Sequence, residues 1–171
     1  MKDQQISDLF QQCLHTATDN EKVILHQLLL GFKEKIKEEG SYIGRLLRMK
    51  RILTETECEI SIPVSELVHN SLQIVHGGIT ATILDSSMGS IANAVCPPSS
   101  SAVTSNLNIH YIAPGKGDFL NAKAKLLHKG SKTLIVEGEV EIIDSNTDTV
   151  KKIAHATGTF FILHPPTENK S

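Results

Sequence analysis

Three chemical groups that can act on a carbonyl compound lie close together in the chain: the amide of Asn70, the glycine pair Gly77-Gly78 and the carboxylate of Asp85. A side-chain amide can donate a hydrogen bond to a carbonyl oxygen, and so can free N–H groups at the start of a helix. Glycine lets a ligand approach such N–H groups closely. The stretch therefore predicts a site for a polarised carbonyl or an oxyanion, although a plain tight turn into a helix would use the same glycines.

Asp85 stands out because it is the only Asp, Glu, Lys or Arg between Glu66 and Lys116. Burying an unpaired carboxylate among apolar residues is costly, so such a residue is normally paired or functional. A carboxylate in this setting can act as a general base or as a nucleophile. The alternative is that Asp85 faces water on a polar strip of its helix, together with Thr82, Ser86 and Asn93.

The elements that would position these groups follow from hydrophobic periodicity. A mostly apolar helix is predicted from residues 76–78 to just before Pro97, because proline cannot continue a helix. Two further helices are predicted within the first 40 residues, with a capping box at Thr18-Asp19-Asn20-Glu21. Strands are predicted over 45–53, 56–63, 103–112, 119–128, 133–143 and 151–163.

This order predicts an α+β fold in which a curved antiparallel sheet wraps around one central helix, with an N-terminal helical extension. The expected division is an arm over residues 1–40, a main domain over 41–163 and a flexible tail over 164–171.

Composition excludes several classes of protein. The 171-residue chain has a formal net charge of −2 and no basic cluster in its N-terminal helices, so binding to nucleic acid is not expected. No signal peptide or membrane-spanning run is recognisable, and three scattered cysteines fit reduced thiols, so a cytoplasmic protein without membrane association is expected. The histidines form no recognised metal-binding pattern, so no metal is expected.

The pattern Asn-x5-His-Gly-Gly-x6-Asp, which runs from Asn70 to Asp85, resembles that of hotdog-fold acyl-CoA thioesterases of the phenylacetate-degradation (PaaI) type. The resemblance covers residues 42–163. It implies a hotdog fold and an enzyme that hydrolyses an acyl-CoA thioester to a carboxylic acid and free coenzyme A. Coenzyme A would then be part of the substrate, no cofactor would be needed, and the chain would form a dimer or a dimer of dimers.

The resemblance also implies roles for individual residues. Asn70 and the N–H of Gly77 would polarise the thioester carbonyl, Asp85 would be the base or nucleophile, and Thr104 would help to place the water. His76 and Gly78 would be structural parts of the turn, although an acid–base role for His76 stays open. The hairpin residues that would contact the coenzyme A arm are Gly130, Ser131 and Lys132, although a basic hairpin is often only a solvated turn.

Two other functions are alternatives for the same pattern of residues. A non-catalytic hotdog module could bind acyl-CoA and report its level, but such a sensor has no need of the carboxylate of Asp85. A hotdog dehydratase or hydratase usually pairs a carboxylate with a catalytic histidine, and the predicted helix has none after His76.

Asp85 lies eight residues beyond Gly77, which is about 12 Å along a helix. A carboxylate that far along the axis cannot easily attack a carbonyl held at the start of its own helix. This spacing therefore predicts that the site is shared between two subunits.

Overall fold

The computed structural model describes residues 2–164, and these divide into two compact units with the chain boundary between Arg48 and Met49. The boundary predicted from the sequence lies between residues 40 and 41. The difference comes from a short helix, α3 (Tyr42–Leu46), which packs against helix α2 (Asp19–Lys37) and so belongs to the first unit. All but the first residue of the predicted tail, 164–171, lies outside the described residues.

The first unit consists of α2, α3 and helix α1 (Lys2–Thr16). The predicted capping box is confirmed, because the N–H of Thr18 donates to the Glu21 carboxylate at 2.7 Å and the N–H of Glu21 donates back to the Thr18 hydroxyl at 3.4 Å. A Cβ on Gly31 would lie 2.6 Å from the carbonyl oxygen of Arg45, so only glycine allows α3 to lie this close to α2.

The strand predicted over 45–53 is wrong in its first half. The Ser41 hydroxyl accepts a hydrogen bond from the N–H of Gly44 at 3.1 Å and caps α3 instead. Only strand β1 (Lys50–Leu53) remains of the predicted strand. A local cap of this kind competes directly with strand formation, which explains the error.

The second unit contains one six-stranded antiparallel sheet in the order β1-β2-β4-β5-β6-β3. Its strands are β1, β2 (Glu57–Pro63), β3 (Ser101–Tyr111), β4 (Phe119–Lys129), β5 (Thr133–Asp144) and β6 (Thr149–Leu163). The five strands predicted after residue 55 are thus confirmed within a few residues. The long strand β3 lies at one edge of the sheet, where it pairs with β6 alone.

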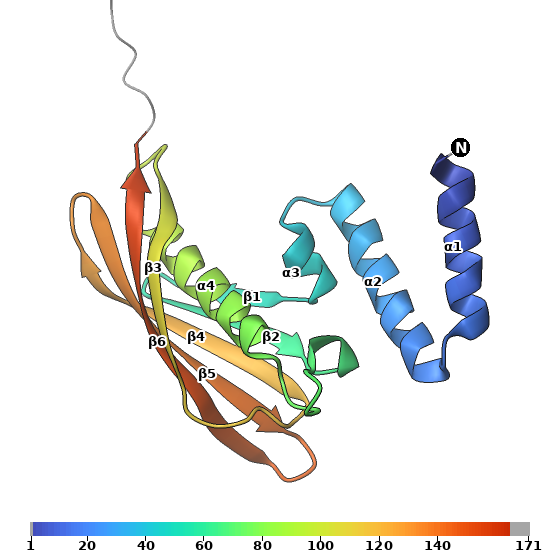
Figure 1. The fold of residues 1–171 in the computed structure, drawn as a ribbon. Helices are drawn as coiled ribbons and strands as arrows, with labels where there is room; N and C mark the ends of the chain where they lie inside the picture. The colour runs from blue at the N-terminus through green and yellow to red at the C-terminus, as the bar shows by residue number, and fades with distance from the viewer. Residues whose placement is uncertain (1, 165–171) are drawn as a thin grey trace, which may run out of the picture. The chain divides into compact units, whose positions relative to one another are not determined.

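Helix α4 (Gly77–Ala94) crosses one face of this sheet, which curves around it (Figure 1). Its core-facing side chains are fully buried against the central strands; they include Ile83, Leu84, Met88 and Ile91. The predicted central helix and the sheet wrapped around it are therefore confirmed. No helix within residues 2–164 is long and apolar enough to span a membrane.

Two strand glycines set how closely α4 approaches the sheet. A Cβ on Gly138 of β5 would lie 2.9 Å from the Met88 sulfur and 3.0 Å from a terminal carbon of Leu84. A Cβ on Gly158 of β6 would lie 2.8 Å from the terminal carbon of Met88. The strands therefore leave space for the helix side chains at these positions, in accord with the close packing of protein interiors.

We predict that Gly138→Val lowers the free energy of unfolding by about 1–3 kcal/mol, because the added side chain overpacks the contact with Met88 and Leu84. Denaturant titration followed by circular dichroism measures the change. Gly89→Ala on α4 is the control, since its Cβ would meet Phe160 at an ordinary 3.6 Å and alanine favours a helix. Equal stability of Gly138→Val and the wild type would contradict this packing.

Candidate active site

The start of α4 is organised by His76, which is the residue that caps the helix. A helix leaves its first four N–H groups without acceptors of its own; here they belong to His76, Gly77, Gly78 and Ile79. The N–H of His76 donates to the carbonyl of Val68 at 2.8 Å, and that of Ile79 donates to the carbonyl of His76 at 2.9 Å. The N–H of Gly78 donates to Nδ1 of the His76 ring at 2.9 Å. His76 and Gly78 thus lie in the turn itself.

The N–H of Gly77 is the one donor of these four that finds no acceptor among residues 2–164. It lies at the positive end of the helix dipole, where negative charge is favoured. Gly78 has a separate reason to be glycine, since its Cβ would lie 3.1 Å from the same His76 ring nitrogen that accepts its hydrogen bond. The turn therefore presents a single backbone donor.

Asn70 lies in the loop that leads to the helix, and its side chain has a fixed orientation. Its Oδ1 accepts hydrogen bonds from the N–H groups of Leu72 at 2.9 Å and Ile74 at 3.4 Å, as in an Asx turn. Its Nδ2 is left without an acceptor in the described part of the chain. Gln73, at φ 56°, closes the loop, and a backbone bridge joins His69 and Val75 across its base.

Asn70 and Gly77 line the same hollow, which has a volume of about 330 Å³. The remaining lining residues are mostly apolar and none is charged: Ile74, Val75, Thr80, Tyr111, Ile112, Ala113, Pro114, Gly115 and Ile153. Two hydrogen-bond donors without acceptors thus border an apolar hollow. Donors in such a setting can hydrogen-bond to a carbonyl oxygen and polarise it.

Asp85 and Thr104 form a second pair, away from this hollow. The Thr104 hydroxyl on β3 donates to Oδ1 of Asp85 at 2.7 Å. Asp85 is half-buried in the single chain rather than enclosed, so its carboxylate remains open to a ligand or a water molecule. The structure therefore brings Asp85 to Thr104, and Asn70 to Gly77, but leaves the two pairs apart along α4.

Tyr111 is a site residue that the sequence analysis missed. Its ring would lie 3.5–3.6 Å from a Cβ on Gly77, and its hydroxyl donates to the carbonyl of Gly77 at 2.9 Å. Tyr111 belongs to the predicted strand 103–112. The alternation of side chains along that strand does not by itself show whether Tyr111 lies on the face of the sheet that carries α4.

The hairpin predicted to contact coenzyme A connects β4 to β5, and the N–H of Gly130 closes it by donating to the carbonyl of Thr133 at 2.9 Å. Gly130, Ser131 and Lys132 are not among the residues that line the hollow beside Asn70. The carbonyl of Lys132 accepts a hydrogen bond from the N–H of Ile162 at 2.8 Å, and Ile162 pairs with Ala102 of β3. Since Ala102 is hydrogen-bonded to Asn93 in the last turn of α4, the hairpin lies toward the opposite end of that helix from Gly77.

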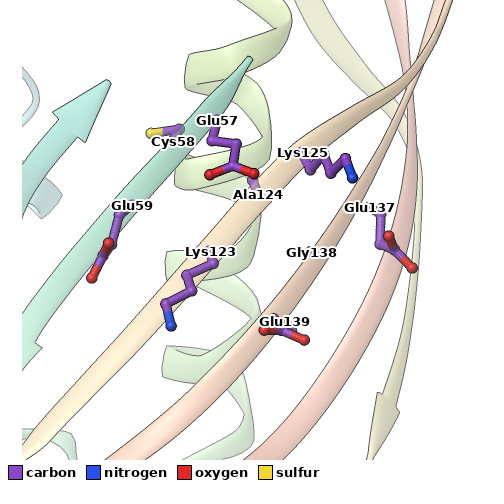
Figure 2. Close-up of a pocket in the computed structure, with 9 residues that line it drawn as sticks. All are labelled: Glu57, Cys58, Glu59, Lys123, Ala124, Lys125, Glu137, Gly138 and Glu139. Atoms are coloured by element: carbon purple, nitrogen blue, oxygen red, sulfur yellow. The ribbon is translucent and has the colours of Figure 1, made fainter. Parts of the chain in front are cut away.

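A second hollow, of about 410 Å³, lies on the other face of the sheet (Figure 2). Its rim is formed by acidic side chains on β2 and β5 and by Lys123 and Lys125 on β4 between them. These charges pair across the strands: Lys123 meets Glu141 at 2.8 Å, and Lys152 meets Glu139. We interpret this surface as the solvated face of the sheet, stabilised by cross-strand pairs.

The described residues 2–164 also contain free cysteines and side chains of the types that can bind a metal ion. Burial is the main cause that raises the pKa values of both Cys58 and Cys96 above the ordinary thiol range, which disfavours the nucleophilic thiolate. Within residues 2–164, no three His, Cys, Asp or Glu side chains are grouped so that they could hold a metal ion.

Comparison with known proteins identifies the family. The thioesterase superfamily model matches residues 72–148. A putative esterase of Saccharolobus solfataricus is 30% identical over 139 residues, which cover 80% of this chain and 94% of that protein. A Bacillus halodurans protein, solved with CoA, is 38% identical with a TM-score of 0.79, covering 90% of this chain and 99% of that one.

The fold likeness extends to the PaaI protein of the E. coli phenylacetic acid degradation operon, at 21% identity and a TM-score of 0.62 over 81% of this chain and 94% of that one. The resemblance stated from the Asn70–Asp85 pattern is thus confirmed at the level of the family. The chain belongs to the thioesterase superfamily of hotdog fold and is a thioester hydrolase.

Proposed function

We propose that the protein is an acyl-CoA thioesterase, which hydrolyses its substrate to a carboxylic acid and free coenzyme A. The observation that carries this proposal is a pair of donors, the Gly77 N–H and Asn70 Nδ2, that have no acceptor within residues 2–164 and belong to residues lining one uncharged hollow. The presence of CoA in the 38% identical relative supports coenzyme A as the carrier of the acyl group.

In this proposal the two donors bind the oxygen of the thioester carbonyl. Negative charge builds up on that oxygen as a nucleophile attacks the carbon, so the hydrogen bonds strengthen toward the transition state. The donors need little rearrangement, because His76 holds the turn around Gly77 and the Asx turn holds Asn70. The apolar walls of the hollow would receive the acyl group.

Asp85 supplies the other half of the reaction, in one of two ways. As a general base it takes a proton from water, the resulting hydroxide attacks the carbonyl carbon, and the C–S bond breaks to release the thiolate of coenzyme A, which is then protonated. As a nucleophile its carboxylate attacks the carbonyl carbon, and the C–S bond breaks to release the thiolate of coenzyme A, which is then protonated. Water then hydrolyses the resulting acyl-enzyme anhydride to the carboxylic acid and the free Asp85 carboxylate. In either case the Thr104 hydroxyl orients the carboxylate through its 2.7 Å hydrogen bond.

In this proposal a second subunit brings the two pairs together. Eight residues of helix place Asp85 about 12 Å from Gly77 along the axis of α4, too far for the carboxylate to attack a carbonyl held at the start of its own helix. The edge of β3 offers a route to pairing, since an eleven-residue edge strand presents unpaired backbone groups to another chain. A two-fold dimer would place each Asp85 beside the partner's donors, and two dimers would form a tetramer.

Contact with the coenzyme A phosphates is assigned to Gly130, Ser131 and Lys132, since phosphates favour lysine and backbone N–H groups. Coenzyme A is here part of the substrate, and the reaction calls for no cofactor. The three free cysteines are consistent with a reducing, cytoplasmic compartment.

The experiment that tests this function is a panel of acyl-CoAs incubated with the protein and a thiol reagent. We expect release of free coenzyme A, with uncharged acyl groups preferred because no charged residue lines the hollow. Tight binding of acyl-CoA without release would instead indicate a non-catalytic sensor. Hydration of an unsaturated acyl group with the thioester intact would indicate a hydratase.

A second prediction concerns the carboxylate. Asp85→Asn should fold and bind substrate but lose about 10²-fold or more in kcat, because the amide cannot accept the proton or act as a nucleophile. Thr104→Val should lose about tenfold, since it removes one hydrogen bond to a charged group. Asp148→Asn, the same change in an exposed turn at φ 52°, is the control and should keep its kcat. Near-normal kcat in a folded Asp85→Asn protein would remove Asp85 from the mechanism.

A third prediction tests the shared site. Asp85→Ala and Asn70→Ala proteins, each inactive alone, are mixed and allowed to exchange subunits. With random exchange half the dimers are mixed, and one of the two sites in each is wild type, so about a quarter of the wild-type activity should return. Native mass spectrometry verifies the exchange. No return of activity after verified exchange would show that each site is built from one chain.

A further inference from the structure

The direction of the Gly77 N–H depends on the conformation of the backbone around it, and two glycines in sequence do not fix that conformation by themselves. Glycine has more conformational freedom than any other residue, and two glycines in sequence have more still. A donor that polarises a carbonyl must be held in place before the reaction, because rearrangement would consume the stabilisation it provides. The two peptide groups on either side of Gly77 must therefore be fixed by other contacts.

Both peptide groups are fixed in the structure. The preceding one is held by the His76 carbonyl, which accepts from the N–H groups of Ile79 at 2.9 Å and Thr80 at 3.2 Å. The following one, between Gly77 and Gly78, is held at both ends: its N–H donates to the His76 ring, and its carbonyl accepts from the Tyr111 hydroxyl at 2.9 Å. Tyr111 is the only contact in this set that comes from outside the helix and its cap.

A β-bulge brings Tyr111 to that position. Thr104 pairs with Phe160 and Asn106 pairs with Thr159, so Ser105 is an extra residue in β3 without a partner in β6. Thr104 and Tyr111 are seven residues apart, and in a regular strand an odd spacing places two side chains on opposite faces. Because of the bulge, Thr104 reaches Asp85 while Tyr111 reaches Gly77 from the same side of the strand.

Side-chain hydrogen bonds join strand β3 to α4 at three places along the helix. At one end the Asn93 side chain exchanges two hydrogen bonds with the backbone of Ala102, at 2.9 and 3.1 Å. The Thr104–Asp85 bond lies in the middle, and the Tyr111–Gly77 bond lies at the other end. One strand thus contacts both halves of the proposed catalytic machinery.

From these contacts we propose that Tyr111 is a positioning residue, whose hydroxyl holds the Gly77–Gly78 peptide so that the Gly77 N–H points at the thioester carbonyl. This inference rests on the proposed function for its catalytic consequence, but the positioning can be measured separately. The hydroxyl and the ring of Tyr111 have different roles: the hydroxyl fixes the backbone, whereas the ring only forms part of the wall of the hollow.

Tyr111→Phe separates these roles, because it keeps the ring and removes only the hydroxyl. We expect kcat to fall about five- to tenfold, the loss typical of one hydrogen bond, while KM changes less than twofold. The chain has one other tyrosine, Tyr42, which contacts Phe32 in the first unit, so Tyr42→Phe is the matched control and should keep both constants.

Amide hydrogen exchange provides a readout without substrate. Loss of the Tyr111 hydroxyl should speed exchange of the Gly78 N–H about five- to tenfold, since the peptide is then held at one end only, and amides buried in the core, such as that of Leu84, should be unaffected. Unchanged kcat and unchanged Gly78 exchange in Tyr111→Phe would overturn the proposal, and so would a rise in KM with kcat intact. If the wild type hydrolyses no acyl-CoA, the proposed function fails, and Gly78 exchange alone decides whether Tyr111 positions the turn.

Discussion

The rest of the site depends on how the first turn of α4 satisfies its backbone donors. The helix leaves four N–H groups without acceptors, and its surroundings take up three of them through the ring and carbonyl of His76 and the carbonyl of Val68. The fourth, on Gly77, has no acceptor among residues 2–164 and lies at the positive end of the helix dipole. Gly77 lines the same hollow as Asn70. A carbonyl oxygen bound there would accept hydrogen bonds from both groups.

Contacts on two sides of α4, with the central strands and with β3, hold the first turn of the helix in place. The sheet curves around α4 and approaches it closely where β5 and β6 carry Gly138 and Gly158, so the helix cannot shift easily along the sheet. On the side of β3, three side chains join the helix and the strand by hydrogen bonds: Asn93, Thr104 and Tyr111. Strand β3 thus positions the site from the edge of the sheet. The side of β3 that faces away from β6 keeps backbone groups that could pair with another chain, as the proposed dimer needs.

Much of this could be predicted from the sequence, because the periodic elements and the Asn70–Asp85 pattern are local signals. The central helix and five of the six strands agree with expectations drawn from spacing and residue type. Asn70 and Gly77, both singled out from the sequence, line one hollow, and their roles stay predictions. Helix α3 was missed because a single serine cap decided between helix and strand. Tyr111 was missed because a bulge reverses the alternation of faces, and a one-residue insertion into a strand leaves no periodic signal.

The most direct test of this account is the infrared carbonyl stretch of a ¹³C-labelled thioester bound to the Asp85→Asn protein, in which turnover is slow. Hydrogen bonds from the Gly77 N–H and Asn70 Nδ2 weaken the C=O bond, so the account predicts a stretching frequency below that of the same thioester in water. Adding Asn70→Ala should move the frequency partway back, since one donor remains. A bound frequency at or above the value in water, unchanged by Asn70→Ala, would contradict the central claim that these two donors hold the carbonyl.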